Sequence, residues 1–408
     1  MASDSFGLER EHKIVRSGVR EVFSPHRPIN QIDLFFGRKS QVRAIIEQLN
    51  TPGQHSLLYG DRGVGKSSLA NIASELLLSG MVNGRLYFAR CDSSSTFESI
   101  LATPLAELGY DLDVTGSTST RTTGGGAKLK VPIAEGGFES KTETQETRKG
   151  LSGSLSPSVA TQILKETQAL LVIDEADVLS SDSDRKKLAE FIKLLSDANA
   201  KFKILVVGVA ETGASLVANH ESVVRCLRET KLNRMMDHEL SQIVEGGADR
   251  LGLSFDARVT RSIVNVSSGY PNFTHLIALK CAEDAIAEDR SIIDKDDLSI
   301  ALHRASQDAE GTLARVYDAA VRSGGTNRYK EIVCAAAGLA KEEFTSKELR
   351  EEIARQTGDS LSQSTVNEYL KRLVSDTGST IMRRVVKGLY KFNDPRMPSY
   401  VKIANQMV

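Results

Sequence analysis

The sequence predicts an α/β protein built on a doubly wound, five-stranded parallel sheet. Two apolar runs carry this prediction: residues 56–59, which lead through a glycine-rich loop into a helix-like stretch, and residues 169–173. Continuous apolar runs are typical of parallel strands that are buried on both faces. Further strands are expected at 85–90, 202–208 and 230–232. Because helical segments separate the strands, right-handed crossovers are expected between them.

The glycine-rich loop has a complete G-x-x-x-x-G-K-[ST] pattern at residues 60–67. Its glycines let backbone N–H groups curl around phosphate oxygens, and the following helix adds its positive N-terminal end. In this pattern Lys66 reaches the β- and γ-phosphates, and the Ser67 hydroxyl ligates Mg²⁺. The pattern therefore predicts ATP and Mg²⁺ as cofactors. The residues expected to hold the nucleotide are Gly60, Asp61, Arg62, Gly63, Val64, Gly65, Lys66, Ser67 and Ser68.

The strand at 169–173 ends in two carboxylates, Asp174 and Glu175. Ligands of open α/β sheets bind at the carboxyl ends of the strands, so these side chains are expected beside the phosphate loop. Asp174 is the predicted second Mg²⁺ contact, and Glu175 is predicted to polarise the attacking water. The alternative is a core strand that ends in a solvated acidic turn.

These motifs resemble those of AAA+ ATPases, with an upstream "GR" box at residues 34–38. The resemblance implies a P-loop NTPase core in which the segment from Ile29 to Arg38 lines the base site, so Arg38 is a nucleotide-binding candidate. It also places the polar "sensor 1" after the fourth strand, at Glu211 or Thr212, although the family more often has Asn there.

Residues 220–226 resemble box VII of the same superfamily, whose arginine reaches into a neighbouring subunit. Arg225 is the first candidate for this catalytic arginine and Arg228 the second, since a planar guanidinium stabilises charge on the transferred phosphoryl group. The prediction implies self-association through Arg225. The alternative is an ordinary surface arginine.

Four amphipathic helices are expected to form a lid, at 236–251, 255–267, 273–289 and 295–323. Where many AAA+ proteins carry a "sensor 2" arginine, residues 269–272 read Gly-Tyr-Pro-Asn. This resembles the Gly-x-Pro turn of STAND signalling ATPases and also the lid of transposition-targeting and secretion ATPases. Pro271 is therefore a nucleotide-binding candidate. The missing arginine implies an ATPase that is slow or stimulated by a partner.

An insertion rich in Gly, Ser and Thr is predicted at residues 112–157. Alternation at 127–133 and a return segment at 138–144 predict a projecting β-hairpin. Lys128 and Lys130 could meet phosphates, or the hairpin could join neighbouring subunits or another protein. The alternative is a solvated excursion without such a role.

The C-terminal part changes pattern after a glycine-rich joint. Helices are expected at 329–339, 345–356 and 362–374, followed by a hairpin of strands at 380–386 and 389–392, which resembles a winged helix-turn-helix. From residue 371 to the end there are eight Lys or Arg against two Asp or Glu. This charge favours phosphate contact, although winged helices also dock proteins. The nucleic-acid candidates are Asn367, Lys371, Arg383, Arg384 and Lys387.

The 408 residues predict two or three domains, and the net charge of −1 gives no overall attraction to nucleic acid. Four widely spaced cysteines and a polar N-terminus favour the cytoplasm, and no apolar run predicts a membrane partner. The expected segments are an N-terminal arm (1–34), the nucleotide-binding core (35–233), the lid (234–323), a linker (324–328), the winged helix (329–395) and a tail (396–408).

Two functions remain open from the sequence. The first is an ATPase of the origin-recognition and transposition-targeting kind, in which ATP drives assembly and the winged helix holds DNA. The second is a STAND-like signalling or defence switch whose winged helix docks protein. The process served, the partner and the oligomeric state are not predicted.

Overall fold

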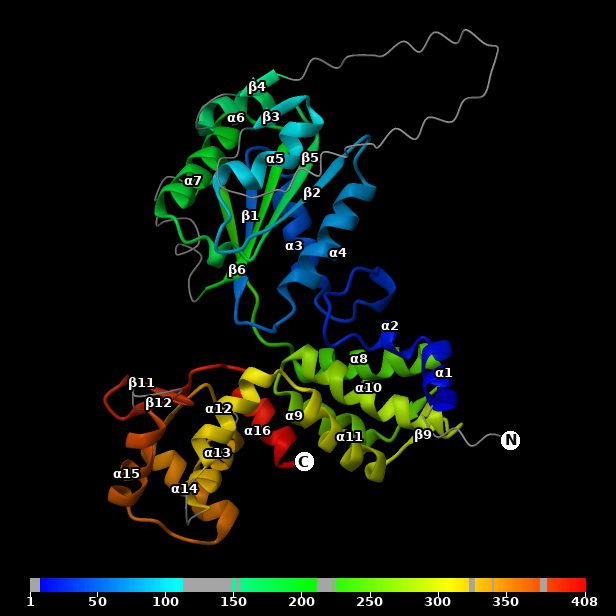
Figure 1. Ribbon diagram of the computed structural model, residues 1–408, viewed down its shortest axis with the longest axis vertical. Helices are drawn as coiled ribbons and strands as arrows, with labels where there is room; N and C mark the ends of the chain where they lie inside the picture. Colours follow the sequence, from blue (N-terminus) through cyan, green and yellow to red (C-terminus); the bar gives the residue numbers. More distant parts are fainter. Residues whose placement is uncertain are drawn as a thin grey trace, which may run out of the picture.

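The computed structural model describes residues 8–112, 149–151, 155–210, 223, 225–322, 327–339, 341–374 and 380–408. Figure 1 shows an α/β core at one end of the molecule, with a helical lid and a C-terminal domain side by side at the other. The predicted insertion hairpin and the sensor 1 candidates Glu211 and Thr212 lie outside the described residues.

The core contains the predicted five-stranded parallel sheet. Its strands are β1 (His55–Gly60), β2 (Arg85–Arg90), β5 (Ala169–Asp174), β6 (Phe202–Val209) and β7 (Leu227–Lys231), in the order β2-β5-β6-β1-β7. The last strand begins at Leu227, earlier than the predicted 230–232. It is an edge strand whose Arg228 and Glu229 are exposed, so it lacks the apolar run that marks the central strands.

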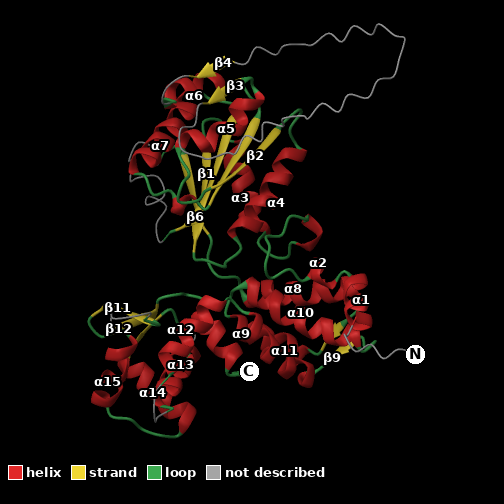
Figure 2. Ribbon diagram, in the orientation of Figure 1, coloured by secondary structure: helices red, strands yellow, loops and turns green. Residues whose placement is uncertain are grey.

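Helices cover both faces of the sheet (Figure 2). The nearest are α3 (Lys39–Asn50), α4 (Lys66–Ser79), α5 (Phe97–Glu107), α6 (Pro157–Leu164) and α7 (Asp182–Asp197). Successive strand residues belong to different cores, because side chains alternate across a strand. Leu58 joins the core that contains Leu69 of α4, whereas Leu57 joins the core that contains Phe191 of α7.

Short elements flank the core. A turn of 3₁₀ helix, η2 (Ala176–Val178), follows β5. Strand β3 (Tyr110–Leu112) pairs in parallel with β4 (Lys149–Leu151), which lies within the predicted insertion.

The lid contains five helices rather than the four predicted: α8 (Asp237–Leu251), α9 (Ala257–Ser267), α10 (Pro271–Ala287), α11 (Lys295–Asp308) and α12 (Gly311–Val321). The predicted helix 295–323 is interrupted because Ala309 has an extended backbone (φ −64°, ψ 158°) and Glu310 precedes α12 as its N-cap. Two-residue strands β8 (Ser254–Phe255) and β9 (Ile292–Ile293) pair in the lid.

The described residues of the predicted N-terminal arm pack on the lid. Helices α1 (Leu8–Ser17) and α2 (Val19–Val22) pack on α10, and η1 (Ile32–Leu34) follows. Arg20 donates to Glu283 of α10 at 2.8 Å, and Arg10 pairs with Asp284. A side chain at Gly247 of α8 would collide with the ring of Phe23, so this glycine lets the N-terminal segment seat against the lid.

The C-terminal domain has three helices and a three-stranded antiparallel sheet, which is the element order typical of a winged helix. The elements are α13 (Arg328–Gly338), β10 (Glu343–Thr345), α14 (Ser346–Thr357), α15 (Gln363–Leu373), β11 (Met382–Val386) and β12 (Leu389–Phe392), with sheet order β10-β12-β11. Strand β10 was not predicted because it is three residues long. At its end, Thr345 and Glu348 form the expected capping box.

The segment expected to be a tail contains a helix, α16 (Met397–Ala404), which packs on α13, α11, α12 and α9. Tyr400, Val401 and Ile403 are buried, and the Ser399 hydroxyl donates to the Ser267 carbonyl at 2.9 Å. Figure 1 shows this helix beside the lid, so the end of the chain ties the C-terminal domain to it. Among the described residues, no helix combines the length and apolar composition needed to span a bilayer.

Candidate nucleotide-binding site

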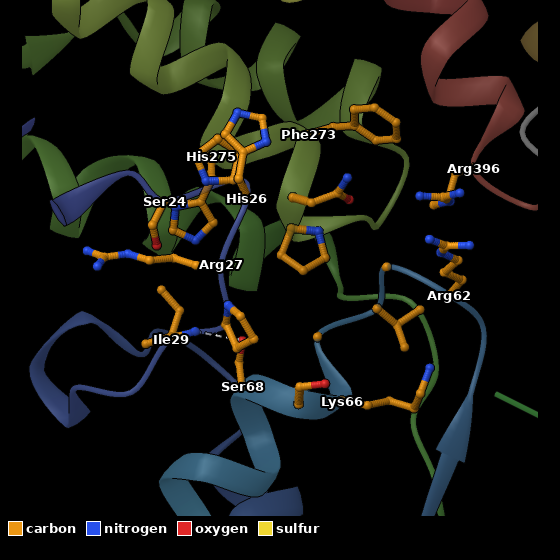
Figure 3. A pocket seen from close by; sticks show the side chains of 18 of the residues that line it. Ser24, His26, Arg27, Ile29, Arg62, Lys66, Ser68, Phe273, His275 and Arg396 are labelled. Atoms are coloured by element: carbon orange, nitrogen blue, oxygen red, sulfur yellow. Dashed lines mark hydrogen bonds between the residues drawn. The ribbon is translucent and has the colours of Figure 1, made fainter. Parts of the chain in front are cut away.

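A cleft of about 840 Å³ opens at the carboxyl ends of β1 and β5, between the core and the lid. Its lining includes the N-terminal segment 24–29, the phosphate loop 62–68, the start of α10, the α11–α12 break and Arg396. Figure 3 shows side chains of the N-terminal segment, the phosphate loop and α10 around one space, with Lys66 and Ser68 on one side and Phe273 and His275 on the other.

The phosphate loop has the backbone that its glycines predict. Gly63 (φ 84°) and Gly65 (φ 93°) occupy the left-handed region, which side chains disfavour. A Cβ on Gly60 would collide with the Leu232 carbonyl, so only glycine fits where β1 enters the loop. Helix α4 begins at Lys66 with no side chain capping its first turn. Its first N–H groups thus remain available to an anion.

Lys66 is buried inside this loop. Its Nζ donates to the carbonyl oxygens of Gly60 at 3.0 Å and Asp61 at 2.7 Å. Burial lowers the pKa of the ammonium to about 8, while the nearby Asp177 and Asp174 act to raise it. The Lys66 ammonium is therefore already held at the loop by these two carbonyls, and it is mostly protonated at pH 7.

The acidic end of β5 faces the same cleft. Asp174 accepts a hydrogen bond from the Glu175 N–H at 2.9 Å, and Glu175 is exposed with a left-handed backbone (φ 58°). Asp177 also lines the cleft and accepts from the Val209 N–H at 2.7 Å. Asp177 was not among the predicted site residues, and what marks it in the sequence is its position two residues after Glu175.

The two serines after Lys66 have different surroundings. Ser67 lines the cleft, where its hydroxyl can serve a metal ion together with Asp174. The Ser68 hydroxyl accepts from the Ile29 N–H at 3.0 Å, and Asn71 of α4 donates to the Ile29 carbonyl at 3.3 Å. Ser68 therefore ties the predicted base segment to the phosphate-loop helix.

The base side of the cleft extends further toward the N-terminus than predicted, to Ser24. Arg38 lines the cleft but is held at the junction of core and lid: its Nη2 donates to the Asn233 carbonyl at 2.7 Å, and its N–H donates to Glu239 at 2.8 Å. Burial lowers the pKa of Arg38 to about 10, although Glu239 opposes this shift.

The lid contributes the first turns of α10. Pro271 sits at the helix start, 3.6 Å from where a Cβ on Gly65 would lie, so the proline packs on the phosphate loop. One turn on, His275 lines the cleft and contacts Phe23 edge to face. Burial lowers the pKa of His275 to about 4, so its imidazole is neutral at pH 7.

A cluster of charged side chains at the loop was not predicted. Arg396 precedes α16, is buried, and pairs with Glu310 at the α11–α12 break. Its Nε and Nη2 donate to Asp394 at 3.0 and 2.7 Å. Arg62 of the loop lies 3.5 Å from the other oxygen of Glu310. No sequence motif connects Arg396 to a loop more than 300 residues earlier.

Arg225, predicted as the catalytic arginine, does not line the cleft. It lies just before β7 begins, where Gln54 donates to its carbonyl at 3.1 Å, and its exposed side chain pairs with Asp197 at 2.9 Å. Strand β7 runs parallel to β1, which starts at His55 and reaches the phosphate loop only at Gly60, so Arg225 lies at the amino-terminal ends of these strands and the cleft at their carboxyl ends. The fold separates Arg225 from its own cleft, as it does the exposed Arg228.

The nucleic-acid candidates are all exposed residues of the C-terminal domain. Asn367 and Lys371 lie on α15, Arg383 and Arg384 on β11, and Lys387 in the turn that follows. In Figure 1, α15 and the β11–β12 hairpin lie at the end of this domain away from the lid. Arg372 differs, because it donates to the Arg322 carbonyl at 2.6 Å and stacks on Tyr329.

Comparison with solved structures shows where this fold recurs. The ORC2 protein of Aeropyrum pernix, solved as ADPNP–ADP complexes, is 15% identical, with 95% of this chain and 97% of that chain covered and a TM-score of 0.51. A Walker-type ATPase of Pyrococcus abyssi is 18% identical, with 93% and 99% covered and a TM-score of 0.49. The comparison with curated proteins gave no match.

A family model described as novel STAND NTPase 1 matches residues 28–384. The match takes in the phosphate loop, the acidic end of β5, the lid and the C-terminal domain as far as Arg384 in β11, so β12 and α16 lie beyond it. The predicted resemblance to STAND ATPases is confirmed by this match, and the fold predicted for a P-loop ATPase is that of the ORC2 protein. The chain belongs to the novel STAND NTPase 1 family.

Proposed function

We propose that the chain binds ATP with Mg²⁺ in this cleft and hydrolyses it slowly. The observation that carries the proposal is the convergence of the buried Lys66, the uncapped start of α4 and the carboxylates of β5 on one space. A left-handed, glycine-lined loop with a buried ammonium fits a chain of phosphates, and a hydroxyl beside a carboxylate fits Mg²⁺.

Each residue then has a distinct task. Lys66 and the backbone N–H groups of residues 63–67 hold the phosphates, and Ser67 and Asp174 hold the metal ion, which screens phosphate charge. Glu175 accepts a proton from the attacking water. The neutral His275 and the apolar residues near Ile29 surround the base.

Slow turnover follows from the distribution of arginines. Residues 269–272 supply no lid arginine, and Arg225 lies at the amino-terminal end of β7, whereas its own cleft lies at the carboxyl ends of the strands. A second subunit that presents its Arg225 would complete the site, so hydrolysis depends on assembly.

The test is nucleotide binding by Lys66→Ala, followed by fluorescence of a labelled ATP analogue or by calorimetry. Losing the buried ammonium removes the main cationic contact, and binding should become undetectable at concentrations that saturate the parent. Lys186→Ala, which removes an exposed cation from α7, should bind as the parent does. Equal affinity in Lys66→Ala and the parent would refute the phosphate-loop assignment.

We further propose that the C-terminal domain binds DNA and so couples the ATP-dependent assembly of subunits to DNA binding. Support comes from the exposed basic residues of α15 and of the β11–β12 hairpin, two elements that lie at the end of the domain away from the lid. The helix would enter a groove and the wing would cross the phosphate backbone. A gel-shift series across salt concentrations, with and without ATP, tests this role.

A second candidate is a signalling switch whose wing docks a protein. The observation that favours it is the exposure of Val385 and Val386 on β11 (39% and 60%), because apolar side chains add little to contacts with phosphate. If the parent shows no salt-dependent affinity for DNA or RNA in either nucleotide state, this candidate takes first place.

A further inference from the structure

Four charged side chains from three parts of the chain meet at the rim of the phosphate loop. They are Arg62 of the loop, Glu310 at the α11–α12 break, and Asp394 and Arg396 between β12 and α16. Figure 3 shows the side chains of Arg62 and Arg396 beside one another at the loop. Both arginines pair with the same carboxylate, that of Glu310.

Arg396 packs directly on the loop. Its Cδ lies 2.9 Å from where a Cβ on Gly63 would be, so the glycine leaves the space that the arginine stem fills. The side chain is only 6% exposed, and a buried guanidinium is costly unless charged partners surround it. A cation has therefore been placed against the predicted phosphate site at considerable cost in desolvation.

The two carboxylates that neutralise Arg396 are held differently. Asp394 is two residues away and accepts from the N–H, Nε and Nη2 of Arg396, so it moves with the arginine. Glu310 belongs to the lid and is partly exposed (36%), and among the described residues its carboxylate pairs with Arg62 and Arg396 alone. Glu310 is thus the carboxylate that can leave without rearranging the segment around Arg396.

We propose that Arg396, together with Arg62, is a ligand for the terminal phosphate of ATP, and that Glu310 neutralises both arginines when that phosphate is absent. The proposal rests on the proposed ATP site. A phosphate at the loop and the Glu310 carboxylate are anions that compete for the same two guanidinium groups. Arg396 then provides, from the C-terminal helix, the cation that the lid lacks at residues 269–272.

The competition makes the preference for ATP over ADP the informative measurement. ADP lacks the phosphate that would replace Glu310, so changes in this cluster should affect ATP much more than ADP. Both dissociation constants are measured by calorimetry with Mg²⁺ for the parent and each variant, and their ratio is compared.

Arg396→Ala should lower the preference for ATP about tenfold or more, the value of one charge-assisted hydrogen bond. Glu310→Gln should raise the preference at least about threefold, because the arginines lose a competing anion but keep a similar side chain beside them. A gain in ATP affinity cannot result from misfolding, so Glu310→Gln keeps the test decisive if Arg396→Ala is unstable.

Two controls separate phosphate contact from other effects. Arg315→Ala removes an exposed cation from α12 that does not line the cleft. Lys402→Ala removes the contacts of α16 with Asn265 and Ser268 without touching the loop. Both should keep the parent's preference for ATP.

Three results overturn the proposal in distinguishable ways. If the parent binds nucleotide and both Arg396→Ala and Glu310→Gln keep its preference for ATP, Arg396 is not a phosphate ligand. If Lys402→Ala lowers the preference as much as Arg396→Ala, docking of α16 and not the guanidinium is responsible. If the parent binds neither nucleotide, the proposed ATP site itself fails.

Discussion

The two walls of the cleft are built in different ways. The core wall comes from two short stretches, the phosphate loop after β1 and the acidic residues that end β5. The opposite wall is assembled from distant segments, among them residues 24–29, the start of α10, Glu310 and Arg396. Chemistry encoded by local spacing is visible in a sequence, whereas chemistry created by packing appears only when the chain is folded.

Arg225 and Arg396 show the same difference between a local sequence pattern and the folded arrangement. Arg225 was assigned to catalysis from a local resemblance, and the fold places it at the opposite end of the strands from its own cleft. Arg396 belongs to no motif, and the fold places it on the phosphate loop. If both contact nucleotide, the first must act on a neighbouring subunit and the second on its own.

The largest expected effect tests the neighbouring subunit. Arg225→Ala should lower ATP turnover by about 10³-fold or more, as removal of an arginine finger does. Activity should return when Arg225→Ala chains are mixed with inactive Glu175→Gln chains, because an intact Glu175 then faces an intact Arg225. ATPase assays across protein concentrations measure both effects.

One outcome of these assays would contradict a role of Arg225 in a neighbouring subunit. A turnover rate per subunit that is independent of concentration, with no rescue on mixing, would show that Arg225 is an ordinary surface arginine paired with Asp197. The site would then be completed by groups within one chain.

The core wall is tested by Glu175→Gln. The amide keeps the shape of the side chain but cannot accept the proton of water, so turnover should fall by about 10²- to 10⁴-fold while ATP affinity stays within about twofold. Glu190→Gln, an exposed carboxylate on α7, is the matched control. Full activity in Glu175→Gln would move the role of base to another carboxylate, with Asp177 the next to examine.

The sequence predicted the core well because its signals are local. Apolar residues predicted the strands β1, β2, β5 and β6, and the loop pattern predicted that Lys66 and Ser67 lie at the cleft. The helix at 295–323 was wrong because its apolar spacing continues past residue 309, while the backbone turns there to bring Glu310 to the loop.

The tail shows the same limit. Residues 397–404 carry a buried face, but its partners lie on α9, α11 and α13, so the pattern alone does not reveal which surface it covers. Docking of this helix is what carries Arg396 to Gly63. The spacing of residues in the sequence predicts neither the docking of α16 nor the position of Arg396 at Gly63.

The wing extends the comparison to a surface remote from the cleft. Changing Arg383, Arg384 and Lys387 to Ala removes up to three phosphate contacts, so the slope of log affinity against log salt on duplex DNA should flatten by ~0.9 per contact. ATP affinity should not change. The same change at three exposed basic residues of the lid, Arg258, Arg261 and Lys295, should leave the slope as it is.

Base contact predicts a different pattern from backbone contact. Asn367→Ala on α15 should cost ~1–3 kcal/mol on a preferred sequence and little elsewhere, since an amide can pair with a base edge. A loss of affinity that is the same for every DNA sequence would mean that Asn367 contacts the DNA backbone and not a base. An unchanged salt slope in the wing variant would favour the protein-docking role.

A pH dependence of ATP affinity, absent below pH 8 and present above it, separates Lys66 from Arg396. Burial lowers the pKa of Lys66 to about 8 in the free site, and an anion bound beside it would hold the proton more tightly. Below pH 8 the ammonium is already charged, so ATP affinity should be nearly flat. Above it, a proton must be taken up on binding, and affinity should fall by up to about tenfold per pH unit. Arg396 stays charged throughout this range, because burial acts to lower its pKa but its hydrogen bonds to Asp394 and Glu310 outweigh burial and raise the pKa. Arg396→Ala should therefore show the same fall from a lower starting affinity. Calorimetry between pH 7 and 9.5 in buffers of different ionisation enthalpy measures the proton uptake directly. An affinity that stays constant to pH 9.5 would mean that Lys66 is fully charged in the free site, with its two backbone carbonyls and the nearby carboxylates outweighing its burial.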